Sequence, residues 1–141
     1  MSGEFLDSNI FVYLFDRTDA HKRGIARHLI QTTTEAGTGV VSFQVVQETL
    51  SVITRRLKTP VTSEDARDFL DRVMMPLWRI MPSQRLYQRG IDFQARYRYG
   101  FYDALIIAAA LAAGCTRLYS EDLQHGQQIE GLTIENPFRA A

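Results

Sequence analysis

The chain has 141 residues, which is the length of one domain of ordinary size. Hydrophobic residues make up 45% of it and charged residues 23%, a balance that excludes disorder, collagen and small disulfide scaffolds. Sixteen Lys and Arg residues balance sixteen Asp and Glu residues, which disfavours a nucleic-acid binder that relies on bulk positive charge.

Cysteine content and hydropathy further restrict the class of protein. The single cysteine, Cys115, allows no internal disulfide and no cysteine-based zinc site. The longest apolar run, residues 104–113, is about half of the roughly 20 residues that a membrane span requires. No positively charged secretory segment opens the sequence. We therefore expect a cytoplasmic protein with one domain over residues 1–141 and no membrane association.

Short apolar runs alternate with longer segments of helical period. In the first half they predict, in chain order, a strand at 4–6, a helix from 18 or 19 to about 34, a strand at 38–42, a helix at 43–57 and a helix from 62 to about 73. In the second half they predict a strand at 77–81, a helix from 83 to near 100, a buried helix from 103 to 113, and strands at 117–120 and 132–134. This order is typical of a three-layer α/β/α fold with a central, mainly parallel sheet.

Four acidic residues lie where a sheet of this kind binds its ligands. In open α/β sheets the ligands bind beyond the carboxyl ends of the strands. Asp7 follows the first predicted strand, Glu48 lies in the helix after the second, Asp103 opens the buried helix, and Asp122 follows the strand at 117–120. These four are the candidate site residues.

Each acid also has an ordinary structural interpretation. Asp103 is well placed to be a helix N-cap. Asp7 with the two polar residues that follow it could form an Asx-turn, and Asp122 could lie in a surface turn. Glu48 and Gln44 lie opposite the apolar stripe of their helix, so periodicity alone assigns both side chains to solvent.

Together the four carboxylates predict a site for a divalent cation. Mg²⁺ and Mn²⁺ prefer oxygen ligands, and converging carboxylates repel one another unless a cation or a proton neutralises them. A helix N-terminus at Asp103 favours its ionised form. The three histidines form no cluster in the sequence, which disfavours zinc.

Four short motifs occur in a familiar order along the chain. They are Asp7-Ser8-Asn9, Glu48 in the helix after the second strand, Tyr102-Asp103-Ala104-Leu105-Ile106, and Ser120-Glu121-Asp122. Their types and spacing resemble those of PIN domains, the fold of VapC-type toxin ribonucleases, over nearly the whole chain. The last motif lacks the second acid and the Phe often found in the family pattern.

The resemblance implies an enzyme that hydrolyses RNA phosphodiester bonds with Mg²⁺ or Mn²⁺. One or two ions would be held by Asp7, Asp103 and Asp122, with Glu48 as a ligand directly or through water. Asn9 and Ser120 would orient these carboxylates by hydrogen bonds. The resemblance also implies a type II toxin–antitoxin pair, with an antitoxin protein as partner and a homodimer.

An RNA substrate requires basic contacts around an acidic site. Two groups of basic residues are candidates, one at the end of the Glu48 helix and one on the helix that begins near residue 83. They are Arg55, Arg56 and Lys58, and Arg85, Arg89 and Arg96.

Two other classes of protein compete with this interpretation. The first is a non-catalytic PIN-like module that binds RNA or a protein. The second is a small phosphotransferase or receiver-like domain, which fits poorly because the sequence after the first strand is Asp7-Ser8-Asn9 rather than D-x-D-x-T.

Overall fold

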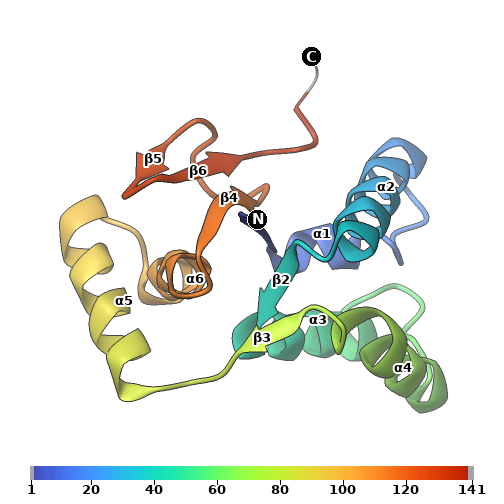
Figure 1. Cartoon of the computed structure of the whole chain (residues 1–141). Coiled ribbons are helices and arrows are strands. Elements are labelled where there is room, and N and C mark those ends of the chain that lie inside the picture. The colour runs from blue at the N-terminus through green and yellow to red at the C-terminus, as the bar shows by residue number, and fades with distance from the viewer. Residues whose placement is uncertain (1, 140–141) are drawn as a thin grey trace.

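The computed structural model describes residues 2–139 and has a sheet at its centre (Figure 1). Its strand order is β3-β2-β1-β4-β6-β5. The parallel strands are β1 (Gly3–Leu6), β2 (Gly39–Ser42), β3 (Trp78–Ile80), β4 (Cys115–Tyr119) and β6 (Leu132–Glu135). The short strand β5 (Gln128–Ile129) runs antiparallel to β6 at one edge. The predicted mainly parallel sheet is therefore confirmed.

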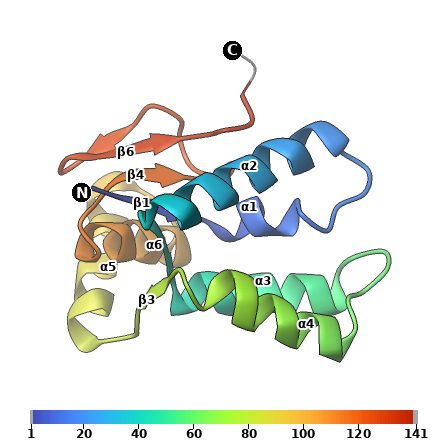
Figure 2. The same ribbon diagram turned by 45° about the vertical axis from the view of Figure 1, so that its right-hand side comes forward.

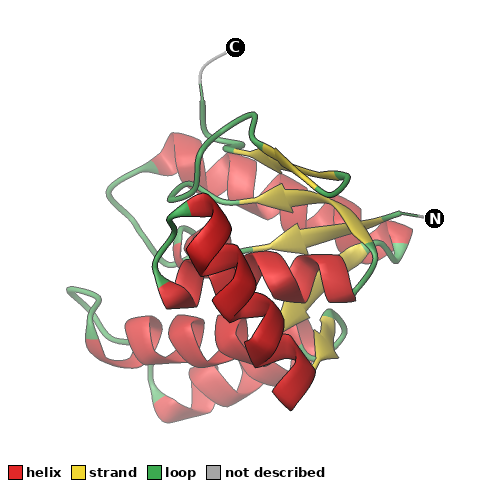
Figure 3. Cartoon of the chain, turned by 90° about the vertical axis from the view of Figure 1, so that its left-hand side faces the viewer, coloured by secondary structure: helices red, strands yellow, loops and turns green. Residues whose placement is uncertain are grey.

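Helices cover both faces of this sheet, which confirms the predicted three-layer α/β/α fold (Figures 1 and 3). One face carries α1 (Ser8–Val12), α2 (Ala20–Ala36), α3 (Phe43–Arg55) and α4 (Ser63–Phe69), which continues into the π-helical turn η1 (Leu70–Met74). Figure 2 shows these helices as two pairs, α1 with α2 and α3 with α4. The other face carries α5 (Gln84–Tyr97) and α6 (Phe101–Ala112).

The path of the chain reverses beside β1. From β1 the chain moves outward through β2 to β3, and then α5 and α6 return it to β4 on the opposite side of β1. At the carboxyl ends of these neighbouring strands, Leu6 pairs with Tyr119. In an open α/β sheet, the position where the strand order reverses is where a ligand-binding crevice forms.

Helix α6 is the most deeply buried helix in residues 2–139. All seven residues from Ala104 to Ala110 are buried, because one side of α6 packs on the sheet and another packs on α5. An added Cβ at Gly90 of α5 would lie 3.3 Å from Leu105 Cδ1, so the absence of a side chain there allows the two helices to approach closely. Within the same described residues, no helix has both the length and the apolar character needed to cross a membrane.

Three local features differ from the sequence prediction. Residues 8–12 form the short helix α1 rather than a plain Asx-turn after Asp7. The two-residue strand β5 was not predicted, because two residues are too few to show a periodicity. Helix α6 begins at Phe101, with Gly100 as its N-cap, so the prediction that Asp103 opens the helix was wrong by two residues.

Glycine at position 39 is a packing requirement that a substitution can test. A Cβ added at Gly39 would lie 2.8 Å from Leu77 Cδ2 and 2.9 Å from Thr33 Oγ1. Gly39→Ala should therefore lower the free energy of unfolding by about 1–3 kcal/mol, measured by urea denaturation. The matched control is Gly24→Ala in α2, where no atom lies within 4 Å of the added Cβ. This control should gain about 0.5–1 kcal/mol from helix propensity, and equal effects of the two changes would contradict the packing argument.

Candidate active site

Asp7 lies at the carboxyl end of β1, where the strand order reverses. It is the N-cap of α1 and only 5% exposed. Its Oδ1 accepts a hydrogen bond from Ser8 N at 2.7 Å, and its Oδ2 accepts one from Ser120 Oγ at 2.7 Å. Ser120 is itself buried at the end of β4. The side chain predicted to orient Asp7 is therefore in contact with it.

Asn9 joins the start of α1 to the loop after β4. Its Nδ2 donates to Asp122 Oδ2 at 3.1 Å and more weakly to Ser120 Oγ at 3.4 Å. Its Oδ1 accepts from the backbone N of Glu121 at 3.2 Å. Asp122 N also donates to Ser120 Oγ at 3.2 Å. Asp7, Asn9, Ser120 and Asp122 thus form one hydrogen-bonded group, although more than a hundred residues separate the two segments.

Glu121 is turned away from this group by contacts that the sequence did not indicate. Lys22 of α2 forms an ion pair with Glu121, and Tyr13 donates a hydrogen bond to the same carboxylate. The Lys22 ammonium also lies 5.0 Å from the centre of the Tyr13 ring. Glu121 is therefore held toward α2, which leaves Asp122 as the acid of this loop that contacts Asn9.

The other two acids come from helices that begin at the same edge of the sheet. Ser42 ends β2 and caps α3, whose second turn carries the exposed Glu48. Asp103 lies in the first turn of α6. It is not the N-cap, so the ordinary interpretation proposed for it was wrong. These acids interact electrostatically, because the charges of Asp103 and Asp122 both raise the pKa of Glu48.

Burial gives Asp7 an unusual acidity. Loss of solvation raises the pKa of its carboxyl group to about 7, against an ordinary value of 3.8. The hydrogen bonds from Ser120 and Ser8 lower this pKa, and the charges of Glu48 and Asp122 raise it further. The hydrogen bonds therefore do not compensate fully for the lost water.

The pKa values of Glu48 and Asp103 are raised as well. At Asp103 the first cause is loss of solvation and the second is the charge of Asp122. At Glu48 loss of solvation again comes first, followed by a lowering effect of Gln44. Because Glu48 remains exposed, we take its desolvation to be weaker than that of Asp7.

The donor set of this edge suits a hard divalent cation. No Lys or Arg from the described residues is among the groups that shift the pKa of Asp7, Glu48 or Asp103. Carboxylates that repel one another without a basic partner fit Mg²⁺ or Mn²⁺. They are not gathered around one point, since within residues 2–139 no three His, Cys, Asp or Glu side chains form a group that could hold an ion. Ion binding would therefore bring these carboxylates closer together.

The predicted basic residues lie in two separate places. Arg55, Arg56 and Lys58 are exposed at the end of α3. Arg96 is exposed near the end of α5, with its guanidinium 6.0 Å from the centre of the Tyr97 ring.

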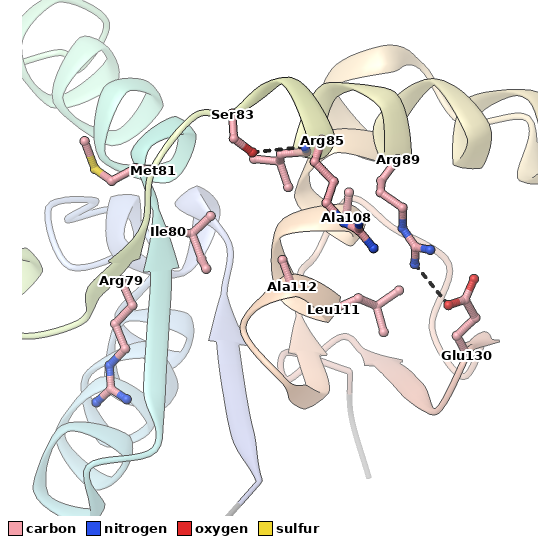
Figure 4. A pocket seen from close by; sticks show the side chains of 11 residues that line it. Arg79, Ile80, Met81, Ser83, Arg85, Arg89, Ala108, Leu111, Ala112 and Glu130 are labelled. Carbon is pink, nitrogen blue, oxygen red and sulfur yellow. Dashed lines mark hydrogen bonds and ion pairs between the residues drawn. The ribbon is translucent and has the colours of Figure 1, made fainter.

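Arg85 and Arg89 line a cavity of about 450 Å³ between α5, the last turns of α6 and β3 (Figure 4). Arg89 donates to Glu130 Oε1 at 3.0 Å, which neutralises part of the positive charge there. Of the four predicted acids, none lines this cavity. The structure therefore does not join these arginines directly to the acidic group.

A sheet whose order reverses at a buried aspartate, with further acids at the same edge, defines an α/β domain with an acidic site. The model of the PIN domain family matches residues 5–127, and the chain belongs to this family. No curated protein sequence matches the chain significantly.

Three solved structures share the fold at low sequence identity. VapC20 of Mycobacterium tuberculosis, described as a sarcin-ricin-loop-cleaving toxin, is 21% identical with a TM-score of 0.65, and the match covers 85% of this chain and 90% of VapC20. A toxin–antitoxin complex from Klebsiella pneumoniae contains a chain that is 19% identical, with a TM-score of 0.69 and coverage of 99% and 100%. A chain of VapBC2 of Rickettsia felis, in a complex bound to a DNA fragment from its promoter, is 19% identical with a TM-score of 0.61. This match covers 94% of the present chain and 97% of the Rickettsia felis chain.

The acidity of Asp7 predicts how stability depends on pH. Because its pKa of about 7 in the folded chain lies above the ordinary 3.8, the folded state binds this proton more tightly than the unfolded state. Ionisation of Asp7 therefore destabilises the fold progressively as the pH rises from about 4 to about 7. At about pH 8 in chelator-treated buffer, Asp7→Asn should raise the free energy of unfolding by up to about 4 kcal/mol and should raise the Tm accordingly. The gain should disappear near pH 4.

The matched control is Asp68→Asn, at an exposed position of α4. Its Tm should differ little from wild type at either pH, as measured by thermal denaturation followed by circular dichroism. If Asp7→Asn gave the same Tm change at both pH values, the carboxylate of Asp7 would not be the uncompensated charge that its burial indicates.

Proposed function

We propose that this protein is a metal-dependent endoribonuclease and the toxin of a type II toxin–antitoxin pair. One observation carries the proposal: a buried aspartate of raised pKa lies among acids without basic partners, at the reversal point of a PIN-family sheet. The fold similarity to a toxin described as cleaving the sarcin-ricin loop supports RNA as the substrate class. The protein would act as one PIN domain over residues 1–141, in the cytoplasm, where RNA is available.

In this proposal Asp7, Glu48, Asp103 and Asp122 would hold Mg²⁺ or Mn²⁺. A bound divalent ion lowers the pKa of water and offsets the charge of a scissile phosphate. Ser120 keeps Asp7 oriented through the hydrogen bond to Oδ2, and Asn9 does the same for Asp122. The carboxylate of Glu48 is exposed and has a raised pKa, so it is suited to accept a proton from an attacking water.

The basic residues would contribute contacts to the RNA backbone. Exposed Arg and Lys side chains bind phosphate groups and set the register of a nucleic acid on a protein. The residues that we assign to this role are Arg55, Arg56, Lys58, Arg85, Arg89 and Arg96. Arg89 would have to leave Glu130 in order to do so.

A second candidate function is a non-catalytic module that binds RNA or a protein partner. It is favoured by the observation that, in the described part of the chain, the carboxylates do not form a ready group for an ion. Calorimetric titration with Mn²⁺ distinguishes the two functions, because the nuclease requires a saturable metal site and the module does not.

Asp103→Asn tests the nuclease directly. The change removes one charged ligand without altering the shape of the side chain, so Mn²⁺-dependent cleavage of RNA should fall to the background rate. The Tm in the absence of metal should equal or exceed that of wild type, because repulsion between Asp103 and Asp122 is relieved. Cleavage is measured on a fluorescently labelled RNA by gel electrophoresis.

The exposed Asp68→Asn variant serves again as the control and should cleave at the wild-type rate. Full-rate cleavage by Asp103→Asn would remove Asp103 from the site and would count against the proposed chemistry.

The proposed antitoxin partner has a separate test. Structures of related fold include toxin–antitoxin complexes, so we expect a small protein encoded beside this one to bind it. Co-expression of the two should yield a stable complex on size-exclusion chromatography and should suppress the RNA cleavage seen with the isolated chain. A neighbouring protein that neither binds nor inhibits would contradict the assignment to a toxin–antitoxin pair.

A further inference from the structure

Gln44 connects the two helices that carry acids of the site. It lies in the first turn of α3 and is only 4% exposed, although periodicity assigned it to solvent. Its Nε2 donates to the backbone carbonyl oxygen of Tyr102 at 3.0 Å. Tyr102 directly precedes Asp103 in the first turn of α6. The Gln44 side chain therefore reaches from one acid-bearing helix to the backbone beside the acid of the other.

The same side chain also lies next to Glu48. The two residues are four positions apart on α3, which places them on one face of the helix. A primary amide has two N–H groups, so the bond to Tyr102 leaves the second N–H available to an acceptor on this face of α3.

The orientation of this amide is determined by its partner. A carbonyl oxygen only accepts hydrogen bonds, so the nitrogen of Gln44 must face Tyr102 and the oxygen must point elsewhere. That oxygen, Oε1, is buried and has no hydrogen-bond partner among residues 2–139. An unsatisfied buried polar atom costs about 1–3 kcal/mol of stability.

The cost of this unpartnered oxygen indicates that Gln44 has a role in the site rather than in packing. An unbranched apolar side chain such as Met would fill a similar volume without burying an unpartnered oxygen. The amide of Gln44 therefore weakens the fold relative to an apolar side chain, and its Nε2 reaches the backbone directly before Asp103. Buried polar groups that are not fully satisfied call for a functional explanation.

We propose that Gln44 is a positioning residue that sets the placement of Glu48 relative to Asp103. The proposal rests on the function given above, because it concerns the same acidic site. Gln44 contacts neither the RNA nor the reacting atoms. It holds the first turn of α6, which carries Asp103, against α3, the helix that carries Glu48 one turn after Gln44.

The experiment compares Gln44→Met with Thr49→Val. Thr49 is the matched control, because it is a second buried polar residue of α3 whose side-chain oxygen has no partner among the described residues. Both changes remove an unpartnered oxygen and should leave the metal-free Tm equal to or above that of wild type. Gln44→Asn, which keeps the amide but shortens its reach, is the second test variant if Gln44→Met does not fold.

The decisive readout is the affinity for Mn²⁺, measured by calorimetry without RNA. Gln44→Met and Gln44→Asn should weaken Mn²⁺ binding by about 10-fold or more, whereas Thr49→Val should bind as wild type does. Wild-type Mn²⁺ affinity in a folded Gln44 variant would overturn the positioning role and leave the proposed function standing. Failure of the wild-type chain to bind Mn²⁺ would overturn both, so the two failures are distinguishable.

Discussion

The arrangement of this site depends on one constraint, the burial of the Asp7 carboxyl group at the point where the strand order reverses. Its burial follows from the fold, because β1 lies in the middle of the sheet and α1 begins immediately after it. Two hydrogen bonds do not replace the lost water, and the neighbouring acids add repulsion. A fold that retains such a carboxylate needs a proton or a cation to neutralise it, and the divalent cation of the proposed function would do so.

The hydrogen bonds around Asp7 also explain why distant segments act as one unit. Ser120 and Asn9 are uncharged and belong to different elements, yet each donates to an acid on the opposite side of the β1–β4 boundary. The ion pair of Lys22 with Glu121 anchors the same loop to α2. Positioning of the acids is therefore shared among polar residues of three segments, which keeps the loop after β4 in register with β1.

The sequence predicts the large features of this molecule well, because they rest on long periodic segments. The stripe of α3 and the continuous apolar run of α6 specify buried faces, and acids that follow parallel strands must meet at one edge. The short elements α1 and β5 escape prediction, since their few residues carry no periodic signal. Gln44 was assigned to solvent for another reason: its burial is caused by α6, which contacts it from a distant part of the sequence. No local pattern records such a contact.

The lengths of the edge strands have a consequence for assembly. The sheet ends in β3 on one side and β5 on the other, with three and two residues respectively. Such short strands present few unpaired backbone groups, so neither border offers a template for another chain to extend the sheet. Two copies of this protein would therefore have to associate through side chains on their helices, and a continuous intermolecular sheet is disfavoured.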